Sequence, residues 1–145
     1  MVMNAAAREL LRTAGLVDVP AHDWWTYLLV SGAGGTVIYD PEPCLSYRQH
    51  AGNQIGANTG FRRRLARYLG AFSGRNRHWN DRNIAALTHN ERLLTPENRE
   101  ILRIFRQSRD LGPFKRLSGL RKAGLYAQTF SGNLGLFFAS LLKKI

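Results

Sequence analysis

The spacing of apolar residues predicts helices at the start of the chain and through its second half. Residues 5–14 place leucines on one face, and Asn4 and Gly15 suit the two ends of such a helix. Thr95 before Pro96 marks another helix start, because a capping hydroxyl is followed by a residue whose fixed φ suits the first turn. Helical periods cover residues 61–72, 75–87 and 96–109. Further along, a short basic stretch at 114–122 precedes a strongly apolar one at 134–142.

Residues 22–53 interrupt this pattern and set many polar groups in an apolar frame. Asp23 precedes an apolar run that ends at Gly32, so we expect a short helix capped by the Asp23 carboxylate. The β-branched residues at 36–39 and the segment 44–48 predict two short strands. Between them, two prolines break any regular ladder and indicate a turn.

Charge divides the chain near Gly60. The net charge is +11, but residues 1–60 hold three bases against five acids, a net charge of −2. Residues 61–145 hold 18 bases and five acids, a net charge of +13. The shift predicts two units, residues 1–60 and residues 61–145, and places any anionic partner on the second.

The cysteine count and the lengths of the apolar runs limit the cellular setting. Cys44 is the one cysteine, so an internal disulfide framework is excluded and a reducing compartment is favoured. Residues 1–15 lack the basic lead and apolar core of a secretory signal, and no apolar run approaches the ~20 residues that span a bilayer. We therefore expect a cytoplasmic protein, with peripheral attachment to the inner face of the cell membrane as an option.

An ordered set of motifs resembles a known enzyme family. HDWWTYLLVSGAGG at 22–35, DPEP at 40–43 and YRQHAGN at 47–53 are similar to the C-terminal half of the catalytic domain of family 2 glycosyltransferases. The resemblance covers residues 1–55. Members of that family have the GT-A fold and transfer a sugar from a nucleotide-sugar donor with inversion. The resemblance implies an α/β fragment: the C-terminal half of a GT-A domain with few short strands, followed by a mainly α-helical extension.

The resemblance also implies roles for individual residues. Asp23 would be the catalytic base that deprotonates an acceptor hydroxyl. Acceptor binding would fall to His22, Trp24 and Trp25. Binding of the donor diphosphate would fall to Arg48 and His50, and His50 is also a candidate ligand for the divalent metal, Mn²⁺ or Mg²⁺, of the complete enzyme.

Each of these residues also has a plain structural interpretation. Asp23 alone is a helix cap, and His22 and His50 alone are structural histidines. Trp24 and Trp25 diverge by about 100° on a helix, so one belongs in the core while the other can stack on a sugar ring. The helical interpretation and the catalytic one are compatible, because a carboxylate at a helix start can also face a cleft.

The chain departs from the family in one important way. It contains no D-x-D, the acidic pair that holds the metal in these enzymes, and no nucleotide-binding βα units. We therefore expect this chain to be part of a larger enzyme of polysaccharide assembly and to be inactive alone. Its partners would be a nucleotide-sugar donor and a glycan or lipid-linked acceptor.

The alternative function is a basic helical module that binds nucleic acid or an anionic membrane surface. Nucleic acid is the weaker option, because no helix-turn-helix, RNA-recognition or zinc pattern is present. For residues 114–145, bases that flank an apolar, aromatic segment match an element that lies on an anionic membrane surface. The competing interpretation is a helix that completes the core of residues 61–110.

Overall fold

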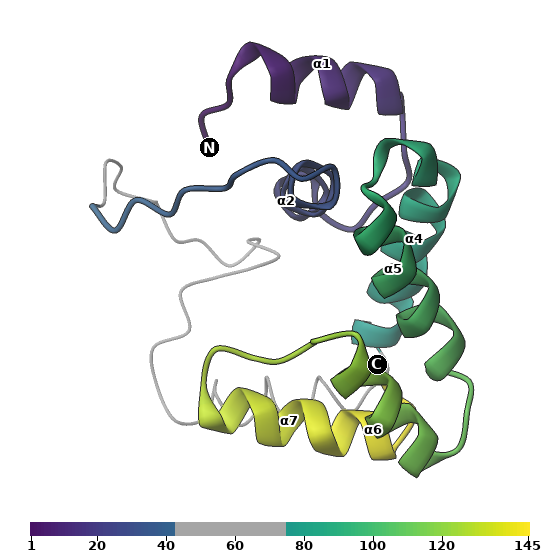
Figure 1. Ribbon diagram of the computed structural model, residues 1–145. Helices are drawn as coiled ribbons and strands as arrows, with labels where there is room; N and C mark the ends of the chain where they lie inside the picture. Colours follow the sequence, from purple (N-terminus) through teal and green to yellow (C-terminus); the bar gives the residue numbers. More distant parts are fainter. Residues whose placement is uncertain (43–74) are drawn as a thin grey trace.

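The computed structural model describes residues 1–42 and 75–145, and every regular element in these two ranges is helical (Figure 1). The helices are α1 (Ala5–Ala14), α2 (His22–Gly32), α4 (Arg75–His89), the 3₁₀ helix η1 (Glu91–Leu93), α5 (Pro96–Ser108), α6 (Pro113–Lys122) and α7 (Phe130–Leu141). In Figure 1, α1 lies at one end, α4 and α5 run side by side, and α6 and α7 form the other end. Helix α2 is viewed along its axis, beside α4 and α5.

The predicted α/β fold class is wrong for the described residues, because none of them forms a strand. Residues 36–39, predicted as a strand, are irregular, and Val37, Ile38 and Tyr39 are exposed. β-branched residues favour an extended backbone, but a strand also needs a neighbour to complete its hydrogen-bonded ladder. The expected C-terminal half of a GT-A domain is therefore not seen here.

Other sequence predictions fall outside the described residues. These are the strand at 44–48, the helix at 61–72 and the boundary near Gly60. Described residues on both sides of that boundary share one core, because Trp25 and Leu29 pack with Ala86 and Leu94.

The helix ends with clear local signals are confirmed. Asn4 Oδ1 accepts the Ala7 N–H at 2.9 Å. Gly15 ends α1 with a positive φ of 72°, which favours glycine. Thr95 Oγ1 accepts the Asn98 N–H at 3.3 Å, and Pro96 occupies the first turn of α5. These groups satisfy backbone donors that a helix start leaves without partners.

Helix α2 is the centre of the main core. Leu29 is fully buried and Trp25 is 4% exposed. These two side chains pack with Ala14 of α1 and with Ala86 and Leu94 on the α4–α5 side. Partly buried residues complete the cluster: Leu10, Leu11, Val17, Val19, Leu87, Leu93 and Leu102. The position of α2 is thus fixed by apolar contacts on both sides.

A second, smaller core joins α5, α6 and α7. It consists of Leu120, Ala139 and Ile145, with Phe105 and Leu136 packed against them. Helix α5 connects the two cores, because it contributes Leu102 to the first and Phe105 to the second.

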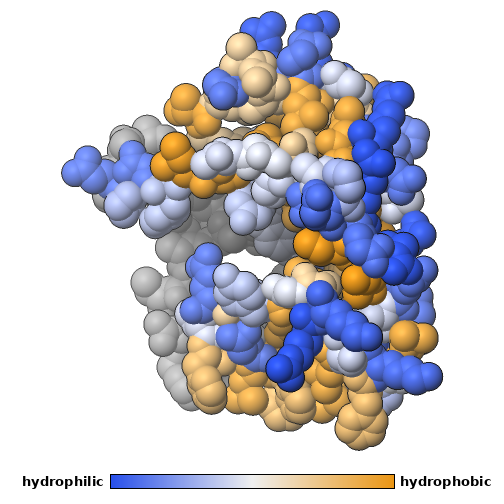
Figure 2. Space-filling model, in the orientation of Figure 1, coloured by the Kyte–Doolittle hydropathy of each residue, from blue (hydrophilic) through white to orange (hydrophobic). Residues whose placement is uncertain are grey.

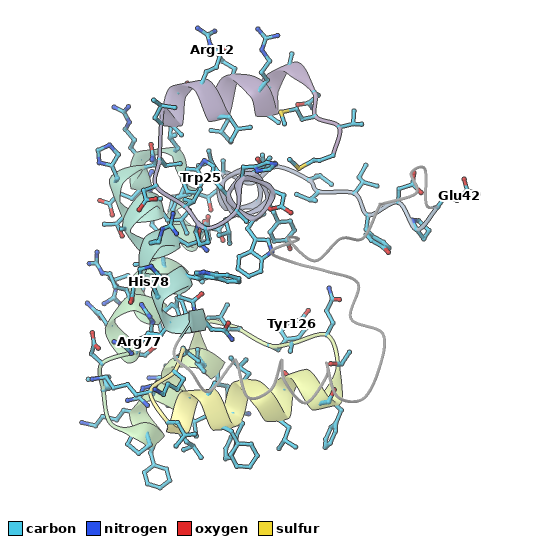
Figure 3. The ribbon with its side chains drawn as sticks, turned by 180° about the vertical axis from the view of Figure 1, so that it is seen from behind. Arg12, Trp25, Glu42, Arg77, His78 and Tyr126 are labelled. Atoms are coloured by element: carbon cyan, nitrogen blue, oxygen red, sulfur yellow. The ribbon has the colours of Figure 1, made fainter. Side chains whose placement is uncertain are left out.

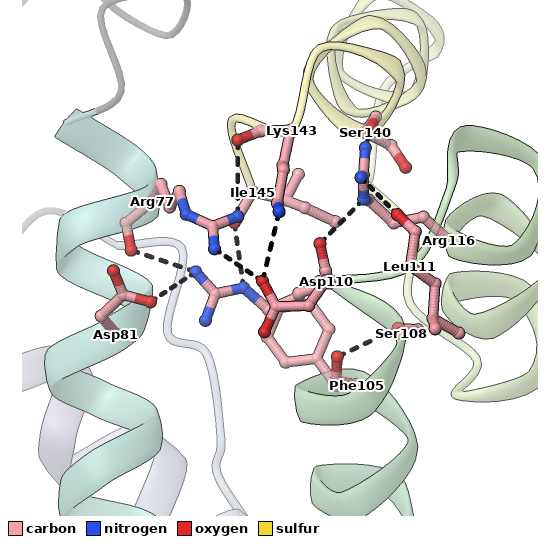
Figure 4. A network of polar contacts seen from close by, with 11 residues as sticks. Arg77, Asp81, Phe105, Ser108, Asp110, Leu111, Arg116, Ser140, Lys143 and Ile145 are labelled. Carbon is pink, nitrogen blue, oxygen red and sulfur yellow. Dashed lines mark hydrogen bonds and ion pairs between the residues drawn. The ribbon is translucent and has the colours of Figure 1, made fainter.

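Two buried arginines tie the C-terminal segment to this end of the molecule (Figure 4). Arg109 Nε donates to the backbone oxygen of Ile145 at 2.9 Å, and Arg109 Nη2 lies 2.7 Å from Asp81 Oδ1. Arg116 Nε donates to the Arg109 carbonyl at 2.9 Å, and Arg116 also bonds the Ser140 carbonyl. Buried cations require such partners, so this network holds α4, α5, α6 and the end of the chain in one arrangement.

We predict that Gly119→Ala destabilises the fold. Gly119 of α6 faces Ser108 of α5 so closely that an added Cβ would overlap the Ser108 side chain. Alanine normally stabilises a helix relative to glycine by about 1 kcal/mol, but forced overpacking costs about 1–3 kcal/mol. Urea unfolding should show a lower midpoint for Gly119→Ala. The exposed neighbour Ser118→Ala should leave the midpoint nearly unchanged, and equal midpoints for both variants would contradict the close α5–α6 contact.

Candidate functional site at the start of helix α2

The C-terminal end of α2 is held by the start of α5. The Gly32 carbonyl accepts the Thr95 N–H and Asn98 Nδ2, both at 3.0 Å. Asn98 Nδ2 also lies 3.3 Å from the Ser31 carbonyl. The last carbonyls of a helix lack partners within it, so α5 supplies them. These contacts fix one end of α2.

The connector into α2 is fixed by α4. Arg82 Nη2 lies 2.5 Å from Asp18 Oδ1 and also donates to the Val19 carbonyl at 3.0 Å. The Asp18 side chain is 84% exposed, and exposed ion pairs contribute little stability. This contact instead positions the chain, because it holds the segment just before His22 against α4.

Asp23 lies in the first turn of α2, but it is not the helix cap that we predicted. The helix begins at His22, and the capping position is Ala21, whose side chain makes no cap hydrogen bond. The predicted interaction with the first turn is nevertheless confirmed, because Asp23 Oδ1 accepts the Trp24 N–H at 2.9 Å. Asp23 is exposed, so its carboxylate is accessible from solvent.

The two tryptophans of α2 point to different environments, as predicted. Trp25 is 4% exposed and belongs to the main core, whereas Trp24 is 43% exposed. The Trp24 ring meets Trp79 of α4 edge-on, with centroids 5.5 Å apart and planes at 82° (Figure 3 shows α2 beside α4). Of the two tryptophans predicted to bind an acceptor, Trp24 therefore has the accessible ring.

Trp79 is a site residue that the sequence did not reveal as one. Trp79 is half-buried and its ring contacts Trp24. The two tryptophans are far apart in the sequence, and helical periodicity carries no information about which helices will meet. The exposed His78 directly precedes Trp79 on α4 (Figure 3).

His22 completes the accessible groups of this turn. Its side chain is exposed, and its carbonyl accepts Thr26 Oγ1 at 2.9 Å. The start of α2 thus combines a carboxylate, an imidazole and an indole pair on the surface, and a buried indole beneath. A carboxylate can accept a proton, and an exposed indole offers a flat apolar face for a sugar ring. We call His22, Asp23, Trp24 and Trp79 the α2 site.

The predicted donor-side residues cannot be placed with the α2 site. Arg48 and His50 lie outside the described residues. Within residues 1–42 and 75–145, no three histidine, cysteine, aspartate or glutamate side chains are grouped to hold a metal ion. Because the candidate ligand His50 lies outside the described residues, the divalent metal implied by the family resemblance stays a prediction.

Comparison with known proteins gives one informative likeness. Over 50 residues the chain is 36% identical to a dTDP-rhamnosyl transferase of Shigella flexneri. The chain is related to a glycosyltransferase. The matched residues are 34% of this chain and 17% of that enzyme, so the chain corresponds to a small part of its length. No family model and no solved structure matches the chain.

Proposed function

We propose that the N-terminal part of this chain is the acceptor-side portion of a family 2 glycosyltransferase of polysaccharide assembly. The observation that carries this proposal is that Asp23 and Trp24, consecutive residues in the first turn of α2, are both exposed, in a chain related to a rhamnosyl transferase. Transfer to a sugar hydroxyl can use a general base, and an exposed indole offers an apolar face for a sugar ring. The donor would be a nucleotide sugar, and the acceptor a glycan or a lipid-linked sugar.

In the proposed reaction, Asp23 accepts the proton of the acceptor hydroxyl. The hydroxyl oxygen attacks the anomeric carbon of the donor sugar and forms the new glycosidic bond. The bond between that carbon and the diphosphate oxygen breaks, and its electron pair leaves with the nucleoside diphosphate. Trp24 and Trp79 would orient the acceptor ring, and His22 would hydrogen-bond an acceptor hydroxyl. Trp25 would act indirectly, by anchoring the helix that carries the base.

The donor side of the proposal rests on the sequence alone. Arg48 and His50 would bind the diphosphate, since guanidinium and imidazole groups suit phosphate oxygens. The rhamnosyl transferase in the comparison makes dTDP-rhamnose the first donor to test.

A chimeric enzyme tests the proposal. Residues 1–55 of this chain would replace the aligned segment of the Shigella dTDP-rhamnosyl transferase, and rhamnose transfer would be measured with radiolabelled dTDP-rhamnose. We expect the chimera to retain transfer within about tenfold of the parent, because Asp23 would supply the base. The isolated chain should give no transfer, because it lacks D-x-D. Turnover by the isolated chain, or a folded chimera without transfer, would contradict the proposal.

A further inference from the structure

Helix α7 buries small residues and leaves most of its large apolar residues exposed. Ala139 and Ser140 are buried against the rest of the molecule. The exposed residues are Phe130 (86%), Leu134 (48%), Phe137 (43%), Phe138 (44%) and Leu142 (54%). A helix whose outer face meets only water normally buries its large apolar side chains and exposes polar ones, because burial of large apolar side chains drives packing. The outer face of α7 therefore has the composition of a contact surface.

These exposed residues lie on one side of α7. Positions 130, 134, 137 and 138 follow the i, i+4, i+7, i+8 spacing of a single helical face, and 142 continues it at the end of the helix. The Phe137 and Phe138 rings meet edge-on at 5.5 Å. In Figure 2, apolar side chains gather along the edge formed by α6 and α7, and in Figure 3 phenyl rings of both helices project away from the molecule. We call residues 130, 134, 137, 138 and 142 the α7 surface.

The charged side chains of the segment that forms α6 and α7 are all cationic. Beyond Asp110 the sequence has no acidic residue, whereas six cations follow: Lys115, Arg116, Arg121, Lys122, Lys143 and Lys144. Arg116 is buried with carbonyl partners, and Lys143 lies 3.7 Å from Asp110. Lys115, Arg121 and Lys122 of α6 are exposed. A second copy of this chain would bring cations against cations, so the charge favours an anionic partner.

A bilayer with anionic headgroups supplies both kinds of contact. No helix in residues 1–42 or 75–145 is long and apolar enough to cross a membrane, and α7 has 12 residues. A helix of this kind binds in the plane of the interface, with its apolar side chains at the boundary between headgroups and acyl chains. We propose that the α7 surface docks on an anionic lipid bilayer, with the exposed cations of α6 against the headgroups. This inference rests on α6 and α7 and is independent of the chemistry at the α2 site.

Co-sedimentation of the full chain with vesicles tests this inference. Vesicles of phosphatidylglycerol and phosphatidylcholine should bind the chain at about 0.1 M salt, where the screening length is about 10 Å, and should bind it at least tenfold more weakly at about 1 M, where it is about 3 Å. Vesicles of phosphatidylcholine alone should bind it weakly under both conditions. Absence of sedimentation with anionic vesicles at the lower salt would overturn the inference.

Matched substitutions locate the contact. Phe130→Ser should weaken binding roughly tenfold, because it removes an apolar side chain from the interface. Tyr39→Ser is the control, since both aromatic residues are 86% exposed and Tyr39 lies in the N-terminal region. Lys122→Gln should weaken binding about fivefold, and Arg8→Gln of α1 should not change it. Equal effects of Phe130→Ser and Tyr39→Ser would exclude the α7 surface as the contact.

A second copy of the chain is the competing occupant, and sedimentation equilibrium without lipid separates it. We expect a monomer at micromolar concentration for both the parent chain and Phe130→Ser. A parent dimer that Phe130→Ser dissociates would overturn the inference and assign the α7 surface to self-association. Circular dichroism of each variant should match that of the parent, because the substituted side chains are exposed.

Discussion

Asp23→Asn is expected to reduce the turnover of the chimeric transferase by about 10²-fold or more. The amide nitrogen and oxygen of asparagine replace the carboxylate without a change of shape, but neither accepts a proton from a hydroxyl at neutral pH. General base catalysis contributes about 10²–10⁴-fold to such reactions. The initial rate of rhamnose transfer at saturating donor and acceptor is the measurement. The loss should appear in kcat rather than in KM, because the acceptor contact of Trp24 remains.

The same substitution should leave the fold intact. The asparagine side-chain oxygen can still accept the Trp24 N–H that Asp23 Oδ1 accepts at 2.9 Å. Asp23 is exposed and packs in neither core, so the free energy of unfolding should change by less than about 0.5 kcal/mol. Thermal unfolding of the isolated chain checks this, and a large drop in stability would mean that Asp23 has a structural role.

Trp25→Ala is expected to have the largest effect on stability. Trp25 is 4% exposed and packs with Leu29, Ala86 and Leu94, so its removal leaves a cavity where α2 meets α4 and α5. Substitutions of buried Trp by Ala cost about 3–5 kcal/mol. Urea unfolding of the chain, followed by circular dichroism, measures the loss.

Trp24→Ala is the matched comparison on the same helix turn. Trp24 is 43% exposed and its described ring contact is with Trp79, so the loss should be about 0.5–1.5 kcal/mol. Similar losses for the two variants would contradict the division between a core indole and an accessible one. In the chimera, Trp24→Ala should raise the KM for the acceptor.

Features decided by neighbouring residues could be predicted from the sequence. Asn4, Thr95 and Pro96 signal helix starts through bonds that close within one turn, and the structure contains those helices. The divergence of Trp24 and Trp25 follows from helical geometry alone. The predicted start of α2 was wrong: the helix begins at His22, before Asp23. An aspartate can bond first-turn N–H groups from within the helix as well as from the capping position, so its presence does not fix the first residue.

Features decided by partners distant in the sequence could not be predicted. The strand expected at 36–39 needed a neighbouring strand, and local preference does not reveal whether one exists. The contact between Trp24 and Trp79 depends on how α2 and α4 meet. The sequence also did not show which face of α7 would be exposed. That helix has apolar residues on every side, so periodicity alone does not identify the buried side.

The most direct test of the account compares two asparagine variants of the chimera. Asp23→Asn and Asp40→Asn both change exposed carboxylates, and each carboxylate accepts a backbone N–H, from Trp24 at 2.9 Å and from Glu42 at 3.0 Å. The account predicts that Asp40→Asn transfers rhamnose at nearly the rate of the unsubstituted chimera and that Asp23→Asn is slower by about 10²-fold or more. Equal rates for the two folded variants would show that Asp23 is not the base and would contradict the proposed function of the α2 site.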